Sequence, residues 1–97
     1  MSVLVIGGDR IEPIRKKLIS YGFNDIEHVT GRKKNEKKMD ISYNTDLVVV
    51  LTDFIGHTLS KNIKNKVKEK DVKVVFAKRS WITMEEQIKS FVKEFNN

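Results

Sequence analysis

The sequence contains no cysteine and carries only one proline, one tryptophan and two histidines in 97 residues. Without cysteine, disulfide bonds, thiolate metal sites and cysteine nucleophiles are all excluded. Any metal ion would have to be held by histidine, aspartate or glutamate. The apolar residues form short blocks, none of which is long enough to cross a bilayer. The sequence therefore predicts a soluble protein that does not enter a membrane.

A chain of 97 residues is too short for two separate hydrophobic cores, so residues 1–97 predict a single domain. Its first residues lead directly into the apolar run at residues 3–6. They show neither the basic region nor the long apolar stretch and small-residue cleavage site of a secretory signal. We therefore expect a cytoplasmic location.

The formal net charge is +6, which favours an anionic partner. The basic residues gather in residues 32–38 and along residues 61–73. The second group follows the outer side of a predicted helix, where lysines usually serve solvation. Aromatic residues do not alternate with the lysines as a stacking surface for single-stranded nucleic acid requires. Nucleic acid is therefore not the favoured partner.

Strands and helices alternate along the predicted chain. Apolar runs and alternations predict strands at residues 3–6, 25–29, 47–51 and 72–77, and helical spacing follows the first, third and fourth of these. Asp9 with Glu12, and Thr83 with Glu86, fit capping boxes for the first and last helices. Residues 32–44 are polar and aperiodic and predict a mobile connection.

This pattern predicts an α/β fold, a small Rossmann-like three-layer sandwich that corresponds to half of a flavodoxin-like domain. Right-handed crossovers give a four-stranded parallel sheet in the order 2-1-3-4. The strand order reverses between the first and third strands, and ligands of such sheets bind at this point, beyond the carboxyl ends of the strands. We expect a crevice between the loops that follow these two strands.

Residues of chemical interest gather at that expected crevice. The candidate ligand-contacting residues are Gly7, Gly8, Asp9, His28, Arg32, Asp53 and His57. A glycine turn lets a ligand approach the backbone, and amides at a helix start favour an anion. Two imidazoles on converging segments could instead hold a divalent metal or haem iron, with His28 and His57 as the metal ligands.

Three segments carry a resemblance to a known family: Gly7-Gly8, the run HVTGR that begins at His28, and the run TDFIGH that ends at His57. They resemble the bacterial domain-of-unknown-function family 2325 (DUF2325), over nearly the whole chain. Gly56 stands where that family usually has serine. The resemblance implies a fold and a site, because the family name records no activity.

Three classes of function remain open at this point. The first is a small ligand-binding or sensory module with a histidine-ligated metal or haem. The second binds an anionic, nucleotide-like or phosphate-bearing ligand at Gly7-Gly8, and the third is a protein-interaction domain. The sequence has no nucleophile elbow, complete GxGxxG motif or P-loop lysine, so a non-catalytic module is expected. A four-stranded sheet also leaves two open edges, which makes a homodimer plausible.

Overall fold

The computed structural model describes residues 1–31, 41–78 and 81–96. Strands and helices alternate through this part of the chain. Their bounds are β1 Ser2–Ile6, α1 Glu12–Ser20, β2 Asp25–Val29, β3 Leu47–Leu51, the short 3-10 helix η2 Thr52–Phe54, α2 His57–Lys70, β4 Lys73–Ala77 and α3 Trp81–Phe95. The predicted α/β class is confirmed, and the four strands lie within one residue of their predicted ends.

The four strands form one parallel sheet in the order β2-β1-β3-β4, as predicted. Every residue of β3 is buried, which explains its continuous apolar sequence, because both faces of a central parallel strand are covered. Ile6 of β1 lies beside Val29 of β2 and Val50 of β3. The three strands therefore end at the same edge of the sheet.

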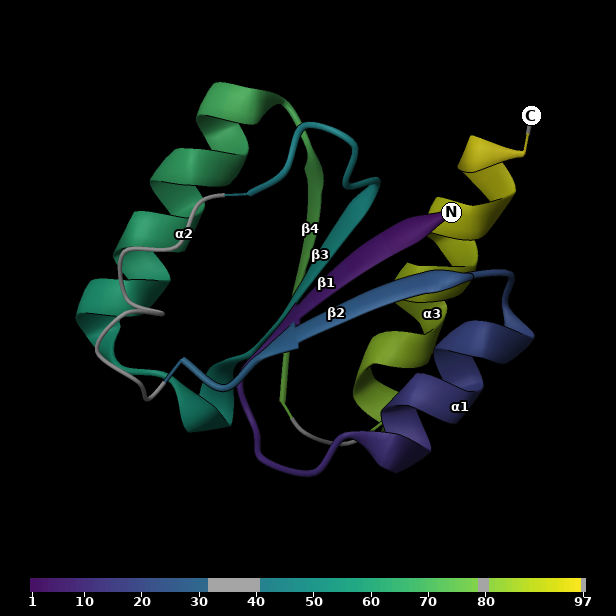
Figure 1. The fold of residues 1–97 in the computed structure, drawn as a ribbon, viewed down its shortest axis with the longest axis horizontal. Helices are drawn as coiled ribbons and strands as arrows, with labels where there is room; N and C mark the ends of the chain where they lie inside the picture. The colour runs from purple at the N-terminus through teal and green to yellow at the C-terminus, as the bar shows by residue number, and fades with distance from the viewer. Residues whose placement is uncertain (32–40, 79–80, 97) are drawn as a thin grey trace.

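Helices cover both faces of this sheet and complete the three layers (Figure 1). Helix α2 lies on one side, whereas α1 and α3 share the other. The α1/α3 core contains Val5, Leu18 and Met84, and the α2 core contains Ile6 and Ile63. None of the helices in the described ranges is long and apolar enough to span a bilayer.

Both predicted capping boxes are wrong. The N-cap of α1 is Ile11, whose side chain makes no capping hydrogen bond, and Pro13 lies in the first turn. Ile11 is buried in the α1/α3 core. Burying an isoleucine contributes about 2 kcal/mol, more than the roughly 1 kcal/mol of a good cap, so packing sets the start of the helix. Helix α3 begins at Trp81, two residues before Thr83.

Most of the predicted mobile connection, residues 32–40, lies outside the described residues. The part after it is packed against the domain. Ile41 is buried in the α2 core, and Asp46 forms two hydrogen bonds with Ser2. The backbone N–H of Ser2 donates to Asp46 Oδ2 at 2.8 Å, and the N–H of Asp46 donates to the Ser2 carbonyl at 2.9 Å. These contacts fix the entry into β3.

A polar contact joins α1 to α3 at the edge of their shared core. The hydroxyl of Tyr21 donates to Glu85 Oε2 at 3.0 Å, and the rings of Tyr21 and Trp81 lie 5.9 Å apart. The indole N–H of Trp81 lowers the pKa of Glu85 most, and the Tyr21 hydroxyl lowers it further. The Trp81 N–H lies close to the carboxylate without the geometry of a full hydrogen bond. Desolvation, followed by the Glu85 carboxylate, raises the pKa of Tyr21.

This contact predicts how stability changes with acid. Because the folded-state pKa of Glu85 is lowered, its contribution is present above the unfolded-state pKa and is lost as pH falls through the folded value. Tyr21→Phe removes one cause of the shift, so denaturation curves between neutral and acidic pH should show a smaller loss of stability in this variant than in the wild type. Tyr43→Phe is the control, because Tyr43 is 95% exposed. Identical pH dependence in Tyr21→Phe and the wild type would contradict the assignment.

Candidate functional site

Three turns meet at the carboxyl edge of the sheet. Gly7 and Gly8 follow β1, Thr30 and Gly31 follow β2, and η2 follows β3 before α2 begins. The strand registers bring the starts of these turns side by side. The chain runs outward from β1 to β2 and, in the opposite direction, from β3 to β4, so the switch point at which parallel α/β proteins bind ligands lies between β1 and β3. Helices α1, α2 and α3 begin on this side, the lower side in Figure 1.

The turn after β1 is built from two consecutive left-handed residues. Gly7 and Gly8 have φ values of 108° and 81°, which residues with a Cβ rarely adopt. The Gly7 N–H donates to the Val29 carbonyl at 2.8 Å and so extends the sheet ladder by one bond. Both glycines are buried, whereas Asp9 and Arg10 are exposed. The glycines therefore shape the turn, and the residues after them face solvent.

His28 fixes this turn from the neighbouring strand. Its Nε2 lies 3.1 Å from the Gly7 carbonyl oxygen and 2.8 Å from that of Gly8. Because carbonyl oxygens only accept hydrogen bonds, these partners assign the proton to Nε2. The structure thus brings together three of the predicted site residues. It gives His28 a positioning role that the sequence did not indicate.

This bonding limits how His28 could hold a metal or haem iron. With Nε2 protonated, only Nδ1 has a lone pair for ligation. His28 also lies beside Val5 in the register, on the α1/α3 face, whereas His57 begins α2 on the opposite face. Within the described ranges no group of three or more potential ligands could hold a metal ion. Ligation by both histidines stays a prediction that the geometry does not favour.

The start of α2 is held against the turn after β2. Gly31 has a φ of 77°, and a Cβ placed on it would lie 2.8 Å from Leu59 Cδ2 and 3.2 Å from Ile55 Cγ2. Only glycine allows this approach, which seats the first turn of α2 beside β2. The sequence carried one signal for this contact, because Gly31 is part of the run HVTGR that begins at His28.

The first turn of α2 is open to solvent. Its N-cap is Gly56, with ordinary backbone angles and no side-chain cap, and the first turn contains no acidic residue. Gly56, His57 and Thr58 are exposed, and no described atom lies within 4 Å of a Cβ placed on Gly56. The first amides of any helix lack intrahelical acceptors and carry partial positive charge. This helix end can therefore accept an anion from solvent.

Two of the remaining predicted residues are exposed near these elements. Asp53 is exposed in η2, Asp9 is exposed in the glycine turn, and Arg32 lies outside the described residues. Thr52, which the sequence analysis did not select, donates its hydroxyl to the Ala77 carbonyl at 3.3 Å. This bond ties the end of β3 to the end of β4.

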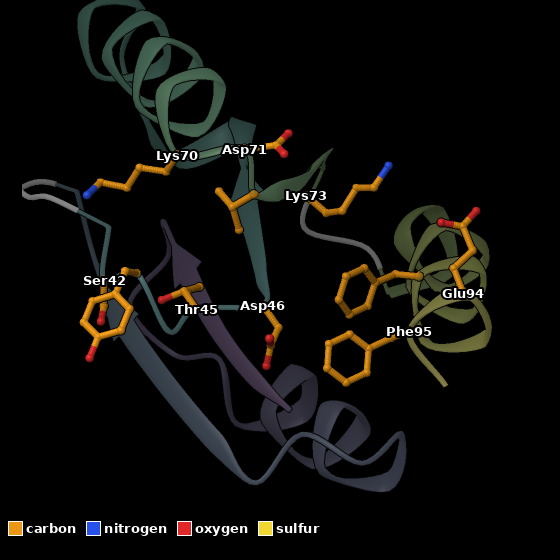
Figure 2. Close-up of a pocket in the computed structure, with 11 residues that line it drawn as sticks. Ser42, Thr45, Asp46, Lys70, Asp71, Lys73, Glu94 and Phe95 are labelled. Atoms are coloured by element: carbon orange, nitrogen blue, oxygen red, sulfur yellow. The ribbon is translucent and has the colours of Figure 1, made fainter. Parts of the chain in front are cut away.

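A pocket of about 510 Å³ lies at the opposite, amino edge of the sheet, where the sequence predicted no site. Figure 2 shows its rim formed by Ser42 and Thr45, by Lys70 and Asp71 at the end of α2, and by Phe95 of α3. Its lining carries carboxylates and lysines together, and Asp46 is already bonded to Ser2. This mixture does not select a ligand of one charge. Segments far apart in sequence form the pocket, so no local motif could reveal it.

A comparison with protein families gives the decisive match. Residues 2–91 match the family described as an uncharacterized protein conserved in bacteria, DUF2325. The chain belongs to this family. Curated proteins and solved structures give no match to this DUF2325 domain. Its function must therefore be argued from its own geometry.

The two histidines of the DUF2325 domain should respond differently to replacement. His28→Ala removes the hydrogen bond that Nε2–H shares between the Gly7 and Gly8 carbonyls and should lower the free energy of unfolding by about 1–2 kcal/mol. His57→Ala, at an exposed position, should change it by no more than about 0.5 kcal/mol. Chemical denaturation measures both. His28→Gln, whose amide can still donate, should fall between them, and equal effects of the two alanine variants would contradict the role assigned to His28.

Proposed function

We propose that this DUF2325 domain is a non-catalytic module that binds a small cytoplasmic ligand bearing a phosphate or carboxylate group. The binding site is the carboxyl edge of the sheet, between the turn after β1 and the first turn of α2. The observation that carries the proposal is the exposed, uncapped N-terminus of a 14-residue helix at the switch point of the sheet. Backbone amides there are a common binding site for anions.

The glycine turn adds amides to the same edge. No cis peptide bond occurs in the described residues, so each N–H points away from the carbonyl of its own peptide unit. His28 holds the carbonyls of Gly7 and Gly8, and the amides of Gly8 and Asp9 therefore point away from the imidazole. Successive amides oriented in this way favour an anion. In this proposal the part-buried contact between His28 and the glycine turn orients the amides that bind the anion.

Exposed side chains at this edge could complete recognition of a nucleotide-like ligand. The His57 imidazole lies in the first turn of α2 and could donate a hydrogen bond to an anionic oxygen. Asp53 could accept one from a ligand hydroxyl. The net charge of +6 attracts anions to the domain as a whole, so the experiment must separate this general attraction from a built site.

The test uses inorganic phosphate, a nucleoside monophosphate and a simple carboxylate, titrated by calorimetry and by thermal denaturation. A ligand that binds the native state at 100 times its Kd should stabilise it by about 2.7 kcal/mol. Gly56→Asp places a carboxylate on the α2 amides. It should stabilise the free protein by up to about 1 kcal/mol but weaken anion binding about tenfold or more. A fall in affinity with a rise in stability cannot come from misfolding.

Asn65→Asp is the matched control, because it adds the same charge at an exposed position further along α2. It should leave the affinity nearly unchanged. The proposal fails if no anion in the panel stabilises the protein, or if both aspartate variants weaken binding equally. Added haemin that binds the wild type and Gly56→Asp alike, but not His57→Ala, would favour histidine ligation instead.

A further inference from the structure

The sheet has two open edges, formed by β2 and β4. Within the part of the chain that the structure describes, each of these strands pairs with only one neighbour, β1 or β3. Among the described residues no backbone hydrogen bond from another segment reaches the outer edge of β4. An unprotected edge strand is a template for pairing with another strand, and native proteins often block it with charges. The two edges of this sheet differ in that protection.

Strand β2 carries exposed Asp25 and Glu27. If two copies paired their β2 strands antiparallel about the central residue, Glu27 would face Glu27 of the other copy. Like charges directly opposite each other destabilise such a pair. The β2 edge is therefore protected against pairing with itself.

Strand β4 has no like charges that would face each other in such a pair. Its sequence is KVVFA, and Lys73 at its start is its only charged residue. Antiparallel pairing about Val75 would place Val74 opposite Phe76 of a second copy, and both side chains are half-buried. Apolar cross-strand pairs of this kind stabilise a sheet. The outer edge of β4 can therefore pair with the β4 strand of a second copy.

A groove of about 460 Å³ beside β4 carries charges that would complement those of a second copy. It is lined by Lys73 and Val75 on the strand side and by Glu86, Ser90 and Glu94 on α3. Ile82, one helical turn before Glu86, is 83% exposed. In the antiparallel arrangement Lys73 of one copy lies opposite Ala77 of the other, at the end of the strand nearest the start of α3. The ammonium group of Lys73 is thereby brought toward the oppositely charged Glu86 of the other copy.

We propose that two copies of this chain pair through β4, antiparallel, to form a continuous eight-stranded sheet. The ligand edge stays open in this arrangement, because β4 lies at the side of the sheet and the switch point lies between β1 and β3. Dimerisation and ligand binding are therefore tested independently of each other.

Sedimentation equilibrium of the full chain over micromolar to millimolar concentration tests the proposal. The wild type should approach twice the 11.3 kDa mass of the chain. Val74→Lys should raise the dimer Kd by about tenfold or more, because it places a charge on the paired edge. Ile26→Lys changes a half-buried apolar residue on the other edge strand and should leave the Kd unchanged. Circular dichroism checks that both variants are folded.

A charge exchange at exposed residues avoids the risk of misfolding. Lys73→Glu and Glu86→Lys should each raise the Kd by about fivefold, and the double variant should restore it. A chain that stays monomeric at every concentration overturns the proposal. This result is also the one expected if the groove beside β4 instead receives a strand of a different protein. A dimer that Ile26→Lys dissociates and Val74→Lys does not also overturns it.

Discussion

Burial of both faces of β1 and β3 is the constraint on which the rest of this structure depends. All five residues of β3 and four of β1 are buried, so neither face of the sheet centre can be left to water. Helices must therefore cover both sides, and short connections between parallel strands place every helix start at one edge. That edge holds the glycine turn and the start of α2. The candidate site therefore results from the same helices that cover the two faces of the sheet.

The sequence predicted the strands well because three of them are short apolar runs and β2 alternates polar and apolar residues. The bounds of β2 and β3 were predicted correctly, and the other two strands differ by one residue at their starts. Helix starts were predicted less well, because burial of Ile11 outweighs a polar cap. Local patterns identify what a segment prefers, whereas contacts from distant segments decide where it begins.

The candidate site was predicted in part for a similar reason. The meeting of the three turns follows from strand order, which the sequence indicated. The face on which His28 lies depends on the register of β2 against β1, and a shift of one residue reverses it. No sequence pattern specified that register. The hydrogen bonds from His28 to the glycine carbonyls, and its separation from His57, therefore became visible only in the structure.

Trp81 gives this molecule an optical reporter for one of its two cores. It is the only tryptophan, it packs against the α1/α3 layer, and its ring lies near Tyr21. The sheet separates it from the α2 layer, whose described packed residues include neither a tryptophan nor a tyrosine. Indole emission therefore follows the melting of one layer, while far-ultraviolet dichroism follows the helices of both. Coincidence of the two signals distinguishes cooperative unfolding from the separate loss of α2.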